Sequence, residues 1–260
     1  MEDAERFKSL KVLPAGKKIY FASDFHLGAP DTESSKSREK RIIEWLEQSK
    51  KNASAFFLVG DVFDFWFEYS RVIPKGFIRF QGKLAEIVDS GIPVYLFAGN
   101  HDLWFRDYFP KELNIPIQNG PISIEINGRT FYIGHGDGLG KGEKTFKLIK
   151  AVFQSKLAQL LFRWLHPDLG IAVANSWSGK SRNRKHSKDD VNLGEAEKLF
   201  EYCKEVESTA HHDFYIFGHR HLPLEMKVAE NSTYINLGEW FKSNSYLEFD
   251  GKKASLCYFN

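Results

Sequence analysis

Cysteine and long apolar runs are the scarcest features of this sequence. Only Cys203 and Cys257 occur, and they form no CxxC motif, so neither a disulfide framework nor a thiolate zinc site is expected. There is no apolar run of roughly eighteen residues, so we expect no transmembrane helix. The first residues, MEDAERFKSLKVL, carry mixed charge and no apolar segment, so we expect no signal peptide. These absences predict a soluble protein of a reducing compartment.

An excess of charge of one sign is also lacking. The 36 Lys and Arg residues nearly balance the 34 Asp and Glu residues, so the chain is not expected to bind nucleic acid, and no obligate protein partner is evident. Histidine and phenylalanine, in contrast, are plentiful, with nine and 23 residues. The position of the histidines therefore becomes the informative question.

The first hundred residues alternate between apolar strands and amphipathic helices. Strands are predicted over 18–22, 55–59 and 94–98, with helices over 37–50 and 77–88 between them. Continuous apolar strands that alternate with helices indicate a sheet covered on both faces. The sequence therefore predicts an α/β fold.

The second half begins with a predicted β-hairpin and continues with an insert. Residues 122–126 and 130–134 flank Asn127–Gly128, a dipeptide favoured in tight hairpin turns. A long helical stretch over 141–165 and a polar, irregular or weakly helical stretch over 166–188 come next. A helix over 191–206 and short strands near 213–217, 223–228, 232–236, 244–249 and 253–258 are expected to complete the chain. We expect a single domain over 1–260, with 140–188 as a helical, lid-like insert.

Five short polar motifs each follow a predicted strand. They are Asp24-Phe25-His26, Gly60-Asp61-Val62-Phe63-Asp64, Gly99-Asn100-His101-Asp102, Gly134-His135-Gly136-Asp137 and Gly218-His219-Arg220-His221. In open α/β sheets, ligands gather outside the carboxyl ends of the strands, so these motifs can converge on one place. His211 and His212 follow neither a strand nor a glycine, and we expect them at the surface.

The residue types in these motifs predict the kind of ligand. Carboxylate, amide and imidazole groups without a thiolate suit Mn²⁺, Fe²⁺, Zn²⁺ or Mg²⁺. Seven candidate ligands exceed the needs of one ion and suit two divalent ions bridged by one carboxylate.

The motif series resembles the calcineurin-like metallophosphoesterase superfamily from Asp24 to at least His221. The resemblance implies a four-layer αββα sandwich with a two-metal site. Carried over to this sequence, one ion would take Asp24, His26, Asp61 and His221, and the other would take Asp61, Asn100, His135 and His219.

The remaining polar residues of the motifs have predicted supporting roles. His101 is expected to stabilise the developing charge or to protonate the leaving oxygen. Asp102 is expected to orient His101 by accepting its ring N–H, and Asp64 to support the surroundings of Asp61. A turn or capping role is the alternative for Asp64 and Asp102.

The insert is the part that bears on the substrate. Its helical stretch, 141–165, is both basic and apolar, which suits an anionic membrane surface or the wall of an acyl-chain site. The stretch 178–188 adds cations that suit a diphosphate. The alternative is an ordinary helix that packs on the core with a solvated basic face.

A closer resemblance is to the UDP-2,3-diacylglucosamine hydrolases of lipid A biosynthesis. It rests on DFHLG, on GDVFDFW, on Glu143 eight residues after His135, and on LGEW at 237–240. The resemblance implies Mn²⁺-dependent cleavage of the diphosphate of this lipid-linked nucleotide sugar at the α-phosphorus, giving UMP and 2,3-diacylglucosamine 1-phosphate. It also implies a cytoplasmic enzyme at the inner-membrane surface. The expected substrate contacts are Asn100, His101, Glu143, Lys185 and His219.

Two other functions remain open at this point. One is a metallophosphodiesterase or phosphatase for another nucleotide or phosphoester. The other is a non-catalytic metal-binding scaffold, although a scaffold should have lost ligands that this chain retains.

Overall fold

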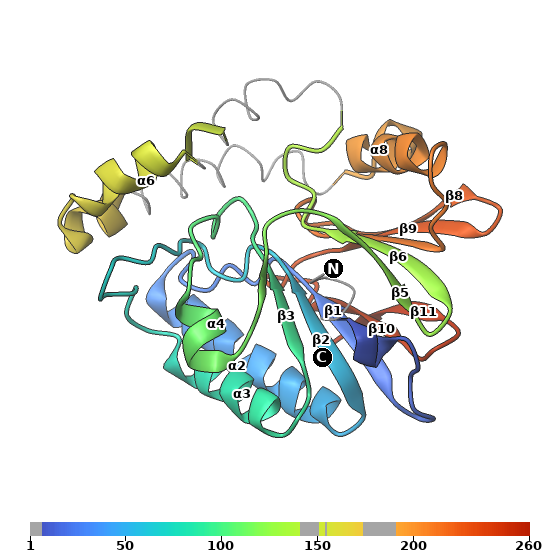
Figure 1. The fold of residues 1–260 in the computed structure, drawn as a ribbon, viewed down its shortest axis with the longest axis horizontal. Helices are drawn as coiled ribbons and strands as arrows, with labels where there is room; N and C mark the ends of the chain where they lie inside the picture. Colours follow the sequence, from blue (N-terminus) through green and yellow to red (C-terminus); the bar gives the residue numbers. More distant parts are fainter. Residues whose placement is uncertain (1–6, 141–150, 154, 174–190) are drawn as a thin grey trace.

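Strands and helices alternate in the first half of the chain, as its apolar pattern predicts. The computed structural model describes residues 7–140, 151–153, 155–173 and 191–260 (Figure 1). The elements up to the hairpin are η1 (Lys8–Leu10), β1 (Lys18–Ala22), α2 (Thr32–Lys50), β2 (Ala53–Val59), α3 (Ile78–Asp89), β3 (Val94–Phe97), α4 (Tyr108–Leu113), β4 (Ile117–Gln118), β5 (Ile122–Ile126) and β6 (Arg129–Gly134).

The second half contributes helix α6 of the insert, helix α8 and the remaining strands. Its elements are α6 (Lys156–Arg163), η2 (Gly194–Ala196), α8 (Lys198–Glu207), β7 (Phe214–Phe217), β8 (Pro223–Ala229), β9 (Ser232–Leu237), β10 (Ser245–Phe249) and β11 (Ala254–Tyr258). The five strands predicted near the end of the chain and the hairpin at Asn127–Gly128 are thus confirmed.

The strands form two sheets. One has the order β11-β10-β1-β2-β3-β4, and the other has the order β5-β6-β7-β9-β8. In the first sheet β1, β2, β3 and β4 run parallel, and in the second sheet β6, β7 and β9 run parallel. The carboxyl ends of the parallel strands therefore lie together at one edge of each sheet, where the polar motifs follow.

Three apolar clusters show that the elements stack in four layers. Phe21, Phe57 and Phe131 belong to a cluster between the two sheets. Phe56, the neighbour of Phe57 in β2, points to the opposite side and packs with Trp45 of α2, because successive strand residues face opposite ways. A third cluster joins α8 to the second sheet. The predicted αββα sandwich is confirmed.

Three helical predictions differ in detail from the structure. Helix α2 begins five residues earlier than predicted, because Asp31 caps it by accepting a hydrogen bond from the Ser34 backbone N–H at 2.9 Å. The predicted helix over 191–206 is divided into η2 and α8, since Gly194 has a left-handed backbone (φ 57°) and Glu197 is extended. Helix α4 was not predicted from the sequence.

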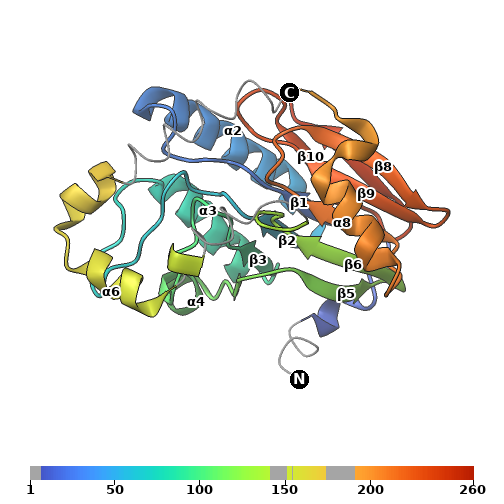
Figure 2. The same cartoon turned by 90° about the horizontal axis from the view of Figure 1, so that it is seen from above.

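The described part of the insert lies at the opposite end of the molecule from α8 in both views (Figures 1 and 2). It packs on the loops after β2 and β3. The Trp104 indole N–H donates to the Phe153 carbonyl at 2.7 Å, and Phe162 of α6 packs against Phe67 and Trp104. Within the described ranges, no helix is long and apolar enough to cross a membrane.

Candidate metal centre

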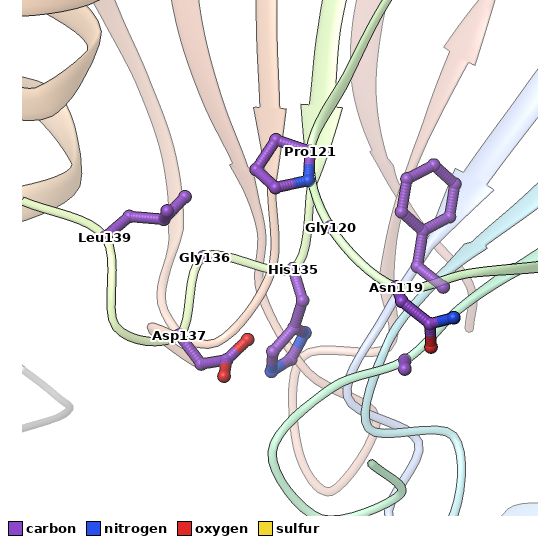
Figure 3. A pocket seen from close by; sticks show the side chains of 9 residues that line it. Asn119, Gly120, Pro121, His135, Gly136, Asp137 and Leu139 are labelled. Atoms are coloured by element: carbon purple, nitrogen blue, oxygen red, sulfur yellow. The ribbon is translucent and has the colours of Figure 1, made fainter. Parts of the chain in front are cut away.

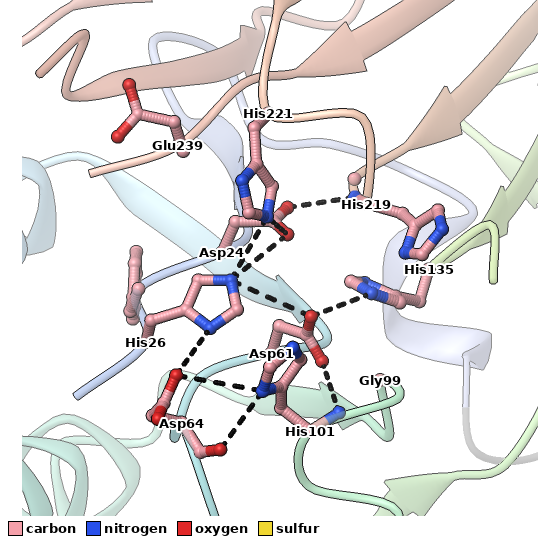
Figure 4. Close-up of polar contacts among 12 residues, drawn as sticks. Asp24, His26, Asp61, Asp64, Gly99, His101, His135, His219, His221 and Glu239 are labelled. Atoms are coloured by element: carbon pink, nitrogen blue, oxygen red, sulfur yellow. Dashed lines mark hydrogen bonds and ion pairs between the residues drawn. The ribbon is translucent and has the colours of Figure 1, made fainter. Parts of the chain in front are cut away.

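The five sequence motifs converge at the place where the carboxyl ends of the two sheets meet (Figure 4). The first sheet supplies the loops after β1, β2 and β3, and the second sheet supplies the loops after β6 and β7. The side chains that gather there are Asp24, His26, Asp61, Asp64, His101, His135, His219 and His221. Segments almost two hundred residues apart in the sequence therefore share one site.

The backbone at this site adopts an unusual conformation. Asp24, His26, Asp61, His219 and His221 all have positive φ angles between 42° and 67°, a region that residues other than glycine rarely occupy. Each such residue costs about 1–2 kcal/mol. Strain of this kind is typical of functional sites, where the surrounding structure enforces it.

Hydrogen bonds between neighbouring loops hold this backbone. The Asp24 N–H donates to the Gly60 carbonyl at 3.1 Å, and the His26 N–H donates to the Asp61 carbonyl at 2.9 Å. The His219 N–H donates to Asp24 Oδ2 at 3.0 Å. The strained loops are thus tied to one another, and their side chains are directed at a common centre.

Four side chains form a first group of candidate ligands, namely Asp24, His26, Asp61 and His221. One ligand atom from each lies within 4.8 Å of every other. His221 Nε2 lies 3.1 Å from both Asp24 Oδ1 and His26 Nε2, and His26 Nε2 lies 3.7 Å from Asp61 Oδ2. Two carboxylates and two imidazoles are thus directed at one point, as around a divalent ion.

A second group consists of Asp61, His135 and His219. His135 Nε2 lies 3.3 Å from Asp61 Oδ2. Its other ring nitrogen, Nδ1, lies 2.9 Å from the Val59 carbonyl oxygen, which can only accept. The proton therefore lies on Nδ1, and the Nε2 lone pair is directed at the site, as metal-binding histidines require. Asp61 belongs to both groups and is the candidate bridge.

Buried polar atoms test whether this site suits metal ions. Within the described residues, Asn100 Oδ1 and His135 Nε2 are buried and have no hydrogen-bond partner. Buried polar groups are normally hydrogen-bonded, so such atoms need an explanation. A cation at the centre of the second group would satisfy His135 Nε2, and the donor set of oxygen and imidazole nitrogen fits divalent ions.

Electrostatics at the centre favour positive charge. Burial by itself lowers the pKa of His26, but the carboxylates of Asp24 and Asp64 outweigh it and raise the pKa to about 9. Burial likewise lowers the pKa of His135, while the negative charge of Asp61 raises it to about 10. Burial raises the pKa of Asp61, but the histidines around it hold that pKa well below its usual range. The buried carboxylates thus attract compensating cations.

Two glycines let the loops approach this closely. A Cβ at Gly99 would fall on the carboxylate and backbone N of Asp61, and a Cβ at Gly218 would fall on Asp24. Any side chain at either position would displace a candidate ligand. Glycine is therefore required there by the close packing of two loops.

The expected orienting role of Asp102 does not fit the structure. Its fully buried carboxylate accepts hydrogen bonds from the backbone N–H groups of Val62 at 2.8 Å and Gly99 at 2.7 Å, and longer ones from Asp61 and Phe63. Asp102 thus fastens the loop after β2 to the loop after β3. The turn role, which was the alternative for this residue, is the one that the structure supports.

Asp64 is the residue that faces the ring of His101. His101 Nδ1 lies 3.1 Å from the Asp64 backbone oxygen and 3.6 Å from its carboxylate. The same carboxylate lies 3.4 Å from His26 Nδ1. Asp64 therefore orients both a candidate ligand and the candidate catalytic histidine, rather than supporting Asp61 alone.

Phe241, in the loop that follows the LGEW segment, was not identified from the sequence. Its ring stacks on His26 with 5.6 Å between the ring centroids. The guanidinium of Arg38 lies over the same phenyl ring, 4.2 Å from its centroid. Arg38 also donates to the His26 carbonyl at 2.6 Å. The buried Glu239 shapes this loop by accepting backbone N–H groups, among them that of Lys242 at 3.0 Å. No periodic pattern signals such a contact in the sequence.

A small pocket opens beside His135 (Figure 3). It is lined by the loops after β3, β4 and β6, through Phe97, Ala98, Asn119, Gly120, Pro121, His135, Gly136, Asp137 and Leu139. Its position next to the second group makes it a candidate place for part of a substrate.

Other predictions from the sequence concern residues outside these two groups. Glu143, Lys185 and the basic stretch 178–188 lie outside the described residues. His212, expected at the surface, is buried at 4% exposure, and its Nε2 lies 2.8 Å from Ser123 Oγ. That expectation was wrong for His212, because its neighbours in the fold are supplied by a distant strand. His211 is exposed, as expected.

Comparison with known proteins agrees with the site. Residues 17–223 match the family of calcineurin-like phosphoesterases. A UDP-2,3-diacylglucosamine hydrolase from Porphyromonas gingivalis is 39% identical over 255 residues, covering 92% of this chain and 96% of that protein. A protein of the same name from Vibrio parahaemolyticus is 28% identical, covering 91% and 96%.

Among solved structures, a phosphoesterase from E. coli aligns with 15% identity and a TM-score of 0.43, covering 94% of this chain and all of that chain. The family match spans most of this chain and includes the six candidate ligands of the two groups and Asn100. The chain is a metal-dependent hydrolase that belongs to the calcineurin-like phosphoesterase family.

Proposed function

We propose that this chain hydrolyses the diphosphate bond of UDP-2,3-diacylglucosamine at the α-phosphorus. Water supplies the oxygen that bonds to this phosphorus, and the bond to the bridging oxygen breaks. The products are UMP and 2,3-diacylglucosamine 1-phosphate. The observation that carries the proposal is the 39% identity to a hydrolase of this name over nearly the full length of both chains.

The two groups of side chains would hold two divalent ions, which we propose are Mn²⁺. Asp24, His26, Asp61 and His221 would hold one ion, and Asp61, Asn100, His135 and His219 would hold the other. When bound, such ions neutralise phosphate charge and activate the attacking water. The hard and borderline donors around the site suit Mn²⁺, although Fe²⁺, Zn²⁺ and Mg²⁺ share this preference.

His101 would act on the leaving oxygen. Its Nδ1 donates to the Asp64 carbonyl, so Nε2 is the atom that can hold or deliver a proton there. Asn100 and His219 would also contact the phosphate, because both belong to the proposed ligand set of the second ion. We retain Glu143 and Lys185 as proposed substrate contacts.

The apolar face of α6 would receive the acyl chains or the membrane surface. Leu157, Leu161 and Trp164 are 65%, 63% and 84% exposed, and exposed apolar patches of this kind mark binding surfaces. Lys156 and Arg163 on the same helix would meet anionic lipid headgroups. We therefore propose a cytoplasmic protein that binds the surface of the inner membrane.

The deciding assay compares two substrates. Purified protein with Mn²⁺ should release UMP from UDP-2,3-diacylglucosamine and turn over a soluble aryl phosphodiester much more slowly. The double variant Leu161→Ser with Trp164→Ser should raise KM for the lipid substrate by roughly a hundredfold or more, because each side chain forfeits about 1.5–3 kcal/mol of burial. Its kcat/KM for the aryl phosphodiester should stay unchanged.

A matched control is Val12→Ser, which removes an equally exposed apolar side chain (76%) that belongs to neither α6 nor the metal-site loops. This variant should leave both activities intact. Absence of UMP release, together with brisk turnover of the aryl phosphodiester, would contradict the lipid proposal. That result would favour a metallophosphodiesterase or phosphatase acting on another substrate.

A further inference from the structure

A buried ion pair outside the site holds the loop 218–221, which carries two of the candidate ligands and is called the ligand loop below. Arg220 lies between His219 and His221 in sequence. Its guanidinium Nε donates to Glu197 Oε2 at 2.9 Å, and its Nη2 donates to Glu197 Oε1 at 3.2 Å. Two parallel N–H···O bonds of this kind fix orientation as well as distance.

Both partners of this pair are shielded from water. Glu197 is 2% exposed, and the side chain of Arg220 is 15% exposed. Glu197 Oε1 also accepts the Leu193 N–H at 3.0 Å, and Arg220 Nη2 donates to the Val191 carbonyl at 2.5 Å. The pair therefore joins the ligand loop to the segment 191–197, which leads from the insert into α8.

The ligand loop needs such a restraint because its backbone is strained. His219 and His221 both have left-handed φ angles, 67° and 58°, which residues other than glycine adopt only when their surroundings enforce them. On the inner side, the His219 N–H is held by Asp24 Oδ2. On the outer side, the restraint comes from Arg220 and Glu197.

We propose that Glu197 and Arg220 are positioning residues that hold both imidazoles of the ligand loop in place for the metal pair. His221 belongs to the first group of candidate ligands and His219 to the second, so a shift of this loop disturbs both metal positions together. Neither Glu197 nor Arg220 contacts the reacting atoms. The proposal rests on the metal assignment made above and is independent of the lipid substrate.

The test measures Mn²⁺ binding directly, in full-length protein freed of metal and without any substrate. Glu197→Gln keeps the shape of the side chain and removes its charge. It should weaken Mn²⁺ binding at both positions about tenfold, the low end of the range for residues that orient ligands. It should also weaken the electron paramagnetic resonance signal of the spin-coupled Mn²⁺ pair. Arg220→Gln breaks the same pair from the other side and should act alike.

Two further variants separate positioning from general stability. Arg220→Lys keeps the positive charge and one donor group, so it should recover part of the affinity that Arg220→Gln loses. Asp213→Asn removes the charge from another arginine–carboxylate pair, Arg129 Nη1 to Asp213 Oδ1 at 2.7 Å, which lies away from the ligand loop. It should keep parent Mn²⁺ affinity even if its melting temperature falls as far as that of Glu197→Gln.

The proposal would be overturned if either Glu197→Gln or Arg220→Gln kept both the Mn²⁺ affinity and the spin-coupled Mn²⁺ signal of the parent protein. Equal loss of affinity in Asp213→Asn would also overturn it, because the effect would then follow stability alone. Since no substrate is present, failure of the lipid assay cannot produce either result.

Discussion

Replacement of Asp102 by asparagine tests whether this residue joins two loops or orients the candidate catalytic residue His101. The buried carboxylate accepts four backbone N–H groups, from Asp61, Val62, Phe63 and Gly99, at 2.7–3.3 Å. The amide of Asn keeps one acceptor oxygen and turns an NH₂ group toward the remaining donors. Two N–H groups then lose their acceptor, at about 1–3 kcal/mol each.

The expected loss is therefore about 4 kcal/mol in the free energy of unfolding. For a chain of this size, 1 kcal/mol corresponds to roughly 2–4 °C, so Asp102→Asn should melt roughly 8–16 °C below the parent. Circular dichroism melts and urea titrations of metal-free protein measure this loss without the added effect of metal binding. Asp107→Asn, which alters an exposed carboxylate paired with Lys111, should leave the transition nearly unchanged.

The outcome that refutes this reasoning is equally specific. If Asp102 oriented His101 instead of joining the two loops, the substitution would weaken the hold on His101 and lower kcat, and the fold would keep its stability. A variant that melts like the parent while kcat falls would restore the orienting role to Asp102 and remove it from Asp64.

The remaining predictions concern the metal centre. Asp61→Asn should abolish hydrolysis and bind fewer than two Mn²⁺ per chain by equilibrium dialysis, because the bridging carboxylate is lost; two tightly bound ions would refute the bridge. Gly99→Ala should lose Mn²⁺ affinity because its methyl group displaces the Asp61 carboxylate, so unchanged affinity would show that the two loops can separate freely. Chelation should stop hydrolysis, and restored Mn²⁺ at a hundred times its Kd should stabilise the fold by about 2.7 kcal/mol for each bound ion, seen as a higher melting temperature.

Much of the site could be predicted because strand order and motif order are both properties of the sequence. Apolar runs locate the strands, and polar motifs at their carboxyl ends must meet when the strands pair in parallel. This reasoning placed Asp24, His26 and Asp61 together without a structure. It also placed His135 and the two histidines of the last motif, although they come from the second sheet.

The supporting residues could not be predicted in the same way. Asp64 and Asp102 are both aspartates at the end of a motif, and only their contacts in the folded chain separate the two roles. Glu197 and Phe241 reach the site from segments without a motif. His212 is buried because Ser123, almost ninety residues away, lies opposite it.

The sequence by itself determined the α/β class, the chemistry of the metal ligands and the family, because these depend on residue types, on their spacing and on which residues are apolar. The tertiary structure alone decided that the Asp64 backbone carbonyl holds the ring of His101, that the Asp102 carboxylate joins two loops, and what holds the ligand loop from outside. Those roles depend on distances between segments that are far apart in the chain. The physical reason is that hydrogen bonds and ion pairs act over about 3 Å, and only the folded chain sets separations of that size.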